Sequence, residues 1–149
     1  MALIVRDARV ADIPAIFAIR TSVRENHLSA EALERMGITP DAIREALQAA
    51  PCLWVAEIDG ELVGFSMADT DEGCVFAAFV RPEREGQGIG RSLMQKAEEF
   101  LFKCHDRIWL ETDGRSRAAG FYRSLGWHLI ETLPSGDVRF EKRQVSPAT

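Results

Sequence analysis

Residues 76–94, FAAFVRPEREGQGIGRSLM, decide the fold, because they pass from an apolar run through a charged turn into an amphipathic segment. The apolar run favours a β-strand that ends before Pro82. The turn carries Gly86, Gly88 and Gly90, and apolar residues then recur at helical spacing. Glycine lets a backbone approach an anion closely, and the first N–H groups of a helix have no partners of their own. We therefore predict that this loop holds a pyrophosphate group.

Two nucleotide-binding alternatives fit the spacing poorly. No Lys-Ser/Thr pair follows the glycines, so a phosphate-loop nucleotide hydrolase would lack its essential residues. The G-x-G-x-x-G spacing of a dinucleotide-binding fold is also missing. A tight strand-to-helix turn that binds no ligand is the remaining alternative.

Length and composition indicate one compact domain. The chain has 149 residues, of which 46% are hydrophobic, enough for an ordinary core. We expect the domain to cover residues 1–145 and the tail, 146–149, to be disordered. No apolar run approaches the length of a membrane span, and the N-terminus becomes charged too soon for a signal peptide. The expected location is the cytoplasm.

Charge and metal-ligand spacing narrow the possible partners. A net charge of −5 argues against broad contact with nucleic acid or an anionic membrane. The three histidines show no ligand spacing, so no metal is expected. We interpret Cys52, Cys74 and Cys104 as buried free thiols, with Cys104 on the apolar face of the helix that follows the glycine loop.

The remaining pattern alternates strands with helices in a mixed order. A hairpin around Asp59-Gly60 is the strongest strand signal, and Asp12 is expected to cap the first helix. This order predicts an α+β fold rather than a doubly wound α/β chain. The predicted strands are 3–8, 52–58, 62–68, 73–80, 107–112, 127–132 and 137–142, and the predicted helices begin at 12, 29, 39, 89 and 116.

The first motif resembles the acetyl-CoA-binding segment of the GNAT superfamily of N-acetyltransferases. That family has Arg/Gln-x-x-Gly-x-Gly/Ala, and Gly88 and Gly90 fall on its glycine positions, whereas Glu85 replaces Arg or Gln. The resemblance implies the GNAT fold, a mixed, mostly antiparallel sheet flanked by helices, with acetyl-CoA as cosubstrate. From this segment and the strand before it, the implied cofactor-binding residues are Phe79, Val80, Glu85, Gly86, Gln87, Gly88, Ile89, Gly90, Arg91 and Ser92.

A second motif lies at residues 117–127, RAAGFYRSLGW, and resembles the family's A-x-x-F-Y-x-x-x-G-F segment. Arg115 stands where family members often have Asn. The resemblance implies that Arg115, Ala118 and Tyr122 line the cofactor, and that Tyr122 is catalytic beside its sulfur. The alternative for Tyr122 is a core tyrosine packed beside Phe121.

Acetyl transfer to an amine needs a carbonyl-polarising donor and a route for a proton. The resemblance implies a backbone N–H near Phe79 or Val80, exposed where two parallel strands splay apart. A primary amine is mostly protonated at neutral pH, so it must first lose a proton. Glu111 is the expected general base, with Asp69 and bulk water as alternatives; a solvated strand-end carboxylate is the other interpretation of both acids.

The predicted function is transfer of acetyl from acetyl-CoA to a primary amine, by direct attack in a ternary complex. The alternative is a catalytically weak or inactive CoA-binding regulatory module, suggested by Glu85 and Arg115. Glu25 and His27 follow the first helix, where the family usually shapes the acceptor pocket, so we expect them to bind the acceptor. The acceptor itself, a small molecule or a peptide, stays open. The last predicted hairpin offers an edge for a possible homodimer.

Overall fold

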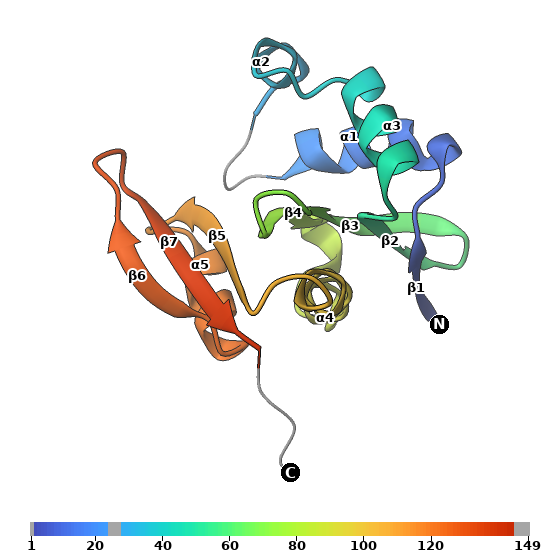
Figure 1. The fold of residues 1–149 in the computed structure, drawn as a ribbon. Helices are drawn as coiled ribbons and strands as arrows, with labels where there is room; N and C mark the ends of the chain where they lie inside the picture. Colours follow the sequence, from blue (N-terminus) through green and yellow to red (C-terminus); the bar gives the residue numbers. More distant parts are fainter. Residues whose placement is uncertain (1, 24–27, 145–149) are drawn as a thin grey trace.

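The computed structural model describes residues 2–23 and 28–144. The described chain contains seven strands in one sheet, five α-helices and two short 3-10 turns (Figure 1). In chain order they are β1 (Leu3–Asp7), η1 (Val10–Asp12), α1 (Ile13–Ser22), α2 (Ala30–Arg35), α3 (Pro40–Ala49), β2 (Leu53–Ile58), β3 (Glu61–Asp69), β4 (Cys74–Val80), η2 (Pro82–Arg84), α4 (Ile89–Phe102), β5 (Arg107–Asp113), α5 (Arg117–Ser124), β6 (His128–Thr132) and β7 (Asp137–Arg143).

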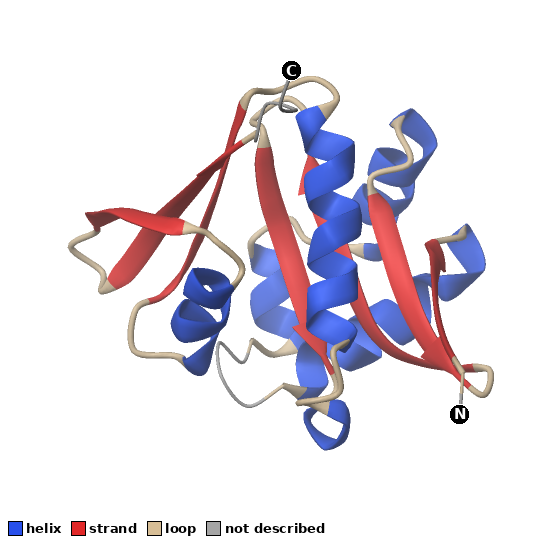
Figure 2. Ribbon diagram, turned by 90° about the horizontal axis from the view of Figure 1, so that it is seen from below, coloured by secondary structure: helices blue, strands red, loops and turns tan. Residues whose placement is uncertain are grey.

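The sheet has the strand order β1-β2-β3-β4-β5-β7-β6. Every neighbouring pair is antiparallel except β4 and β5, which run parallel. Figure 1 shows α1 and α3 on one face of the sheet and α4 on the other, and Figure 2 shows α4 lying along the middle strands. The predicted α+β fold with a mixed, mostly antiparallel sheet is confirmed.

Two apolar cores hold the layers together, one on each face of the sheet. On the α4 face, Leu93 and Met94 are fully buried, and α5 joins the same core through Ala119 and Tyr122. On the α1 face, Ile16 and other residues of α1 and α3 pack against β2 and β3. The helices α1, α4 and α5 therefore bury apolar residues against the sheet, which contributes most of the stability of such short helices.

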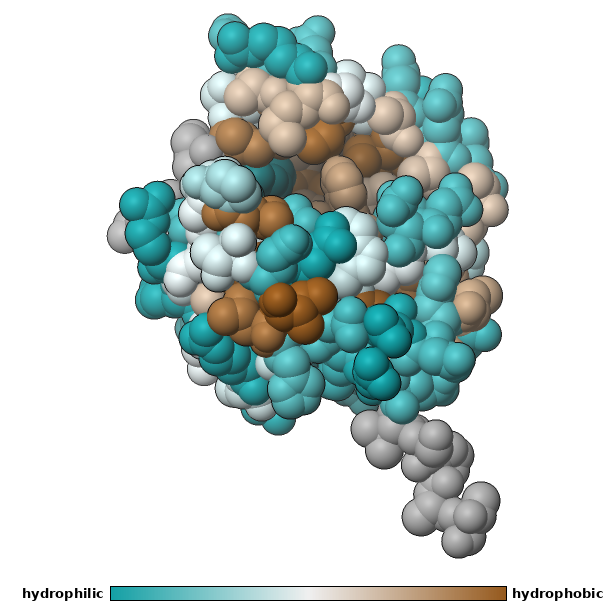
Figure 3. Space-filling model, turned by 60° about the vertical axis from the view of Figure 1, so that its left-hand side comes forward, coloured by the Kyte–Doolittle hydropathy of each residue, from teal (hydrophilic) through white to brown (hydrophobic). Residues whose placement is uncertain are grey.

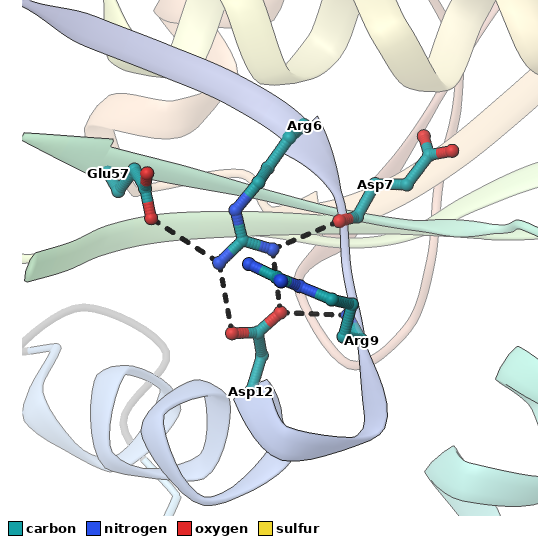
Figure 4. Close-up of polar contacts among 5 residues, drawn as sticks. All are labelled: Arg6, Asp7, Arg9, Asp12 and Glu57. Carbon is teal, nitrogen blue, oxygen red and sulfur yellow. Dashed lines mark hydrogen bonds and ion pairs between the residues drawn. The ribbon is translucent and has the colours of Figure 1, made fainter. Parts of the chain in front are cut away.

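Polar side chains cap the N-termini of α2 and α3 with hydrogen bonds, but not the N-terminus of α1. Ser29 Oγ accepts from the Ala32 N–H at 3.1 Å, and Thr39 Oγ1 accepts from the Ala42 N–H at 3.1 Å. The prediction that Asp12 caps α1 is wrong, because its side chain makes no cap hydrogen bond. Its carboxylate instead binds the guanidinium of Arg6 on β1 (Figure 4).

The cysteine prediction is correct for two of the three thiols. Cys52 and Cys74 are buried and free, but Cys104 is exposed. The prediction fails there because α4 ends at Phe102, so the helical periodicity no longer directs residue 104 toward the core. None of the described helices is long and apolar enough to cross a bilayer. Within 2–23 and 28–144, no three His, Cys, Asp or Glu side chains gather into a possible metal site. The predicted tail lies outside the described residues.

Candidate active site

Strands β4 and β5 part almost as soon as they meet. Cys74 and Trp109 form their single registered pair, and the Trp109 N–H donates to the Gly73 carbonyl at 3.2 Å. Each strand stays paired on its other side, β4 with β3 and β5 with β7. The gap between them therefore opens toward the end of β4 that leads into the glycine loop. The splay that the family resemblance implied is present in this chain.

The register of β4 decides which of its backbone N–H groups face this gap. Phe79 pairs with Phe65 on β3, and the Arg81 N–H donates to the Val63 carbonyl at 2.8 Å. Alternate residues of an antiparallel strand direct their amides to the same side. The Phe79 amide therefore faces β3, whereas the amides of Ala78 and Val80 face the gap. Of the two expected donors, the register favours Val80, and it adds Ala78, which the sequence did not single out.

The glycine loop continues directly from this strand. Gly86 and Gly88 both have a φ of +81°, a left-handed conformation that side chains rarely adopt, and no heavy atom lies within 4 Å of a Cβ built at either. Gly90 is different, because it already belongs to α4 and a Cβ there would lie 3.2 Å from Phe121 Cζ. Two glycines thus shape the turn, and the third lets α4 approach α5.

The first turn of α4 supplies the expected backbone donors. Its first intrahelical bond runs from the Ser92 N–H to the Gly88 carbonyl, at 3.2 Å. The amides of Ile89, Gly90 and Arg91 precede it and have no intrahelical acceptor. These donors and the positive end of the helix dipole lie where the loop opens, which suits a phosphate group.

Glu85, the unexpected acid of the loop, is held by an arginine from α5. Arg117 Nη2 lies 2.8 Å from Glu85 Oε2, and both side chains are largely exposed. The ion pair connects the glycine loop to the first residue of α5, and both residues line the same cavity. A negative charge therefore stands where the family has Arg or Gln, with a positive charge beside it.

Tyr122 lies on α5 and is 8% exposed. Its ring contacts the rings of Phe121, Trp127 and Phe140, with centroids 5.4, 6.4 and 6.2 Å away. Burial raises the pKa of the Tyr122 phenol to about 12. The side chain also lines the cavity, so it is both a core residue and a wall of the site.

The two expected bases lie in different surroundings. Glu111 lines the cavity, and Arg139 donates to its Oε2 from Nε at 3.0 Å and from Nη2 at 2.8 Å. Arg139 in turn lies over the Trp109 ring, 4.0 Å from its centroid. Asp69 accepts from the amides of residues 71 and 72 in the turn before β4, so it caps a turn at the closed end of the strand.

One cavity of about 1240 Å³ connects these parts. On the α4 face its walls include the glycine loop and Tyr122, and on the α1 face they include Phe17 and Arg20. It therefore passes through the sheet where β4 and β5 separate. Figure 3 shows a hollow with apolar walls in the surface of the molecule. Its volume exceeds that of most single-ligand pockets, so two substrates can be accommodated.

Most of the predicted site residues meet in this cavity. Those that line it are Phe79, Val80, Glu85, Gly86, Gly88, Ile89, Gly90, Arg91, Glu111, Ala118 and Tyr122. Gln87, Ser92 and Arg115 do not line it: the Ser92 hydroxyl donates to the Gly88 carbonyl, and Arg115 is paired with Asp113 at 3.6 Å. Glu25 and His27 lie outside the described residues.

Several other residues in the cavity walls carry no distinguishing signal in the sequence. Arg20 has the spacing of an ordinary helix residue, and Phe76 has that of an ordinary strand residue. Asp113 and Asp137 stand opposite each other in the β5–β7 ladder and both line the cavity, although they are far apart in the chain. Only the sheet register brings the two carboxylates together.

Comparison with known proteins agrees with this geometry. The profile of the acetyltransferase (GNAT) family matches residues 14–127. The chain belongs to this family. The predicted enzyme class, an acetyl-CoA-dependent N-acetyltransferase, is confirmed at the level of the GNAT family.

Two curated relatives of the GNAT chain act on different acceptors. Peptidyl-lysine N-acetyltransferase YiaC of Escherichia coli K12 is 32% identical over 130 residues, covering 85% of this chain and 84% of that protein. The L-methionine sulfoximine/L-methionine sulfone acetyltransferase of Pseudomonas aeruginosa is 25% identical over 155 residues, covering 94% and 88%.

Solved structures share the fold at lower identity. PaiA N-acetyltransferase from Thermoplasma acidophilum, in complex with coenzyme A, superposes with a TM-score of 0.77 at 18% identity, covering 97% of this chain and 100% of that one. YncA from Salmonella typhimurium, a putative acetyltransferase with acetyl-CoA, gives a TM-score of 0.75 at 20% identity, covering 100% and 98%.

Proposed function

We propose that this chain transfers the acetyl group of acetyl-CoA to a primary amine by direct attack in a ternary complex. The observation that carries the proposal is the parting of β4 and β5. It leaves the amides of Ala78 and Val80 directed at a cavity that Tyr122 also lines. In the reaction a C–N bond forms, the C–S bond breaks, the amine gives up a proton, and the sulfur leaves with the electron pair.

The residues around the glycine loop suit the diphosphate of acetyl-CoA. Backbone amides at the start of α4 and the left-handed turn at Gly86 and Gly88 supply donors without side chains in the way. Arg84 and Arg91 also line this end of the cavity and add positive charge. When bound, the cosubstrate supplies the activated acyl group, and the gap-facing amides stabilise negative charge that develops on its carbonyl oxygen.

Tyr122 acts as a hydrogen-bond donor to the departing sulfur. Burial raises the pKa of its phenol to about 12, about 3.5 units above an ordinary thiol near 8.5, so full proton transfer is uphill by roughly 5 kcal/mol. A hydrogen bond that strengthens as charge develops on the sulfur avoids this cost. The thiolate then takes its proton from water after it leaves the protein.

Glu111 receives the amine proton, directly or through a water. Arg139 donates hydrogen bonds from Nε and Nη2 to Oε2 of Glu111. We therefore assign acceptance of the amine proton to Oε1. Glu111→Gln keeps the shape of the side chain and removes its basicity. We expect a lower rate and a changed rate–pH profile, whereas an unchanged profile would leave deprotonation to bulk water.

Direct attack is favoured over an acyl-enzyme, because the described residues lining the cavity include no cysteine. Cys74 is buried where β4 and β5 are still paired, and burial raises the pKa of its thiol to about 12. A thiol that is hard to ionise is a poor nucleophile.

The test combines binding with turnover. Purified protein is mixed with acetyl-CoA and a panel of primary amines, and thiol release is measured above the rate without amine. Thermal-shift measurements with coenzyme A run in parallel. Amine-dependent release supports acetyl transfer, whereas coenzyme A binding without release would favour a non-catalytic module. Failure to bind coenzyme A at all would exclude both.

A further inference from the structure

Among the residues that the structure describes, those on the acceptor side of the cavity are apolar except for one cation. The helices α1 to α3 and the turns after them contribute Ile16, Phe17, Arg20, Val23, Leu28, Leu33, Met36, Ile38 and Ile43 to its walls. Among these described residues only Arg20 carries a charge. Met36 and Phe76 also line the cavity and are 62% and 49% exposed, so apolar surface is open to solvent where the cavity opens.

Arg20 lies beside the strand that carries the gap-facing amides. Its Cζ is 4.2 Å from the centroid of the Phe79 ring, and Phe79 stands between Ala78 and Val80. The guanidinium is partly desolvated, and burial lowers the pKa of Arg20. Desolvating a cation costs free energy, which hydrogen bonds and ion pairs to the guanidinium offset. A guanidinium has five N–H donors, so it can bind a ligand alongside its partners in the folded chain.

The opposite wall of the cavity has the opposite charge. Asp113 and Asp137 face each other across the β5–β7 ladder, and Glu111 lies two residues before Asp113 on β5. Arg115 and Arg139 offset part of this charge, through contacts of 3.6 Å with Asp113 and 2.8 Å with Glu111. A ligand between the two walls meets an arginine on one side and carboxylates on the other.

We propose that the acceptor is a free α-amino acid with an apolar side chain, whose carboxylate binds Arg20. The proposal rests on the acetyltransferase function given above and adds the class of its acceptor. In an α-amino acid the nitrogen and the carboxylate carbon are two bonds, about 2.5 Å, apart. In the proposed arrangement the amine lies in the gap beside Val80, and the carboxylate binds Arg20, whose guanidinium packs on the ring of the neighbouring Phe79. The apolar side chain then covers Phe17, Leu33 and the exposed mouth.

Matched acceptors test the proposal with the unaltered protein. L-leucine is compared with 3-methylbutylamine, which lacks the carboxylate, and with L-leucinamide, which carries no negative charge. We expect kcat/KM for leucine to be higher by about 10- to 100-fold, the range for a hydrogen bond between charged groups. Leucinamide has the less basic amine, so amine ionisation alone would favour it. Equal values for the three amines, or a preference for a peptide lysine, would overturn the proposal.

Arg20→Gln shows whether this residue is the origin of the preference. We expect KM for leucine to rise by about 10- to 100-fold, with KM for 3-methylbutylamine and for acetyl-CoA changed by less than about twofold. Arg44→Gln is the matched control, because Arg44 is an exposed arginine of α3 paired with Asp41 and is not among the cavity-lining residues. An equal loss for both acceptors would show that Arg20 acts only through packing.

A binding measurement separates this proposal from the proposed function. The probe is 4-methylpentanoate, which is leucine without its amine, with 4-methylpentanol as the uncharged control. We expect the acid, and not the alcohol, to raise the melting temperature of wild type and of Arg44→Gln, but not of Arg20→Gln. This result supports the carboxylate site even if no amine is acetylated. Equal shifts with acid and alcohol, or no shift in wild type, would overturn it.

Discussion

Tyr122 is a core residue for which we also propose a catalytic role, and burial in the core affects how its phenol can act. Its ring is part of the α4-side core, and the burial that this packing requires raises the pKa of the phenol to about 12. A phenol that resists ionisation is a poor proton donor to a thiolate, but it stays protonated at every useful assay pH. Packing thus favours a permanent hydrogen-bond donor over an acid that must be regenerated in each cycle.

Tyr122→Phe tests this role. We expect kcat to fall by about 100-fold or more, since a positioned donor typically contributes 10²–10⁴-fold, with KM for acetyl-CoA nearly unchanged. In wild type, the rate should show no fall as the pH rises through about 10, the ordinary pKa of tyrosine. Steady-state kinetics between pH 6 and about 10.5 check both statements. Unchanged turnover in the variant would remove Tyr122 from the mechanism.

Substitution by alanine should change the stability of the protein in opposite directions at two glycines that have equal space around them. Gly88 has a φ of +81° and Gly120 lies within α5, and a Cβ at either would meet no atom within 4 Å. Gly88→Ala should lower the free energy of unfolding by about 1–2 kcal/mol, from backbone strain alone. Gly120→Ala should raise it by about 0.5–1 kcal/mol. Urea denaturation measures both, and changes of the same sign would contradict the assigned conformations.

At the scale of elements, the glycine loop and α5 act together. They are separated by α4 and β5 in the chain, yet Glu85 and Arg117 join them at 2.8 Å, and Gly90 lets Phe121 approach α4 closely. The loop is expected to bind the diphosphate and α5 carries Tyr122. The two contacts therefore keep Tyr122, the proposed donor to the sulfur, close to the proposed diphosphate site.

Removing one or the other charge of this ion pair should change KM for acetyl-CoA in opposite directions. Glu85→Gln removes a negative charge near the diphosphate, so KM for acetyl-CoA should fall by about two- to fivefold. Arg117→Gln removes a positive charge, so KM should rise by a similar factor. Both effects should shrink at high salt, because the side chains are exposed. Stability should change by less than about 0.5 kcal/mol in either variant. Effects of equal sign would contradict the electrostatic account.

Local patterns in the sequence predicted the elements well, and long-range pairing explains what they missed. The turn at Gly86 and Gly88 and the start of α4 follow from residues within one segment. The choice of Val80 and Ala78 over Phe79 depends on the register with β3, which no local pattern contains. Asp12 has a typical capping position, but Arg6 on the neighbouring strand competes for its carboxylate. Tertiary contacts override a local preference of about 1 kcal/mol.

At the scale of the whole molecule, the candidate active-site cavity and the ion-pair cluster at the β1 edge of the sheet share no residues. The cavity passes through the sheet between β4 and β5. At the other end, Arg6 on β1 binds Asp12 at 2.9 and 3.1 Å and Glu57 on β2 at 3.3 Å (Figure 4). The Arg9 N–H donates to Asp12 at 2.7 Å. This cluster ties β1, η1 and β2 together, and none of its residues lines the cavity.

The cluster makes stability, but not catalysis, depend on Asp12 ionisation. The hydrogen bonds from Arg6 lower the pKa of Asp12 from its ordinary value of 3.8. An acid with a lowered pKa stabilises the fold above its ordinary value, and the contribution is lost as the pH falls below it. Asp12→Asn should therefore cost about 1.5–3 kcal/mol of unfolding free energy at pH 7, with acetyl transfer unaffected.

Urea denaturation at a series of pH values measures the difference between Asp12→Asn and wild type. We expect the difference to shrink as the pH falls below about 4, because the unfolded wild-type chain then takes up a proton at Asp12 that the native state, with its lowered pKa, does not. Asp41→Asn is the control, since Asp41 is 82% exposed and, among the residues that the structure describes, forms an ion pair only with Arg44 one turn away. This variant should cost less than about 0.5 kcal/mol. A difference for Asp12→Asn that stays constant from pH 7 to about 3 would show that packing, and not the ionised carboxylate, holds this edge of the sheet.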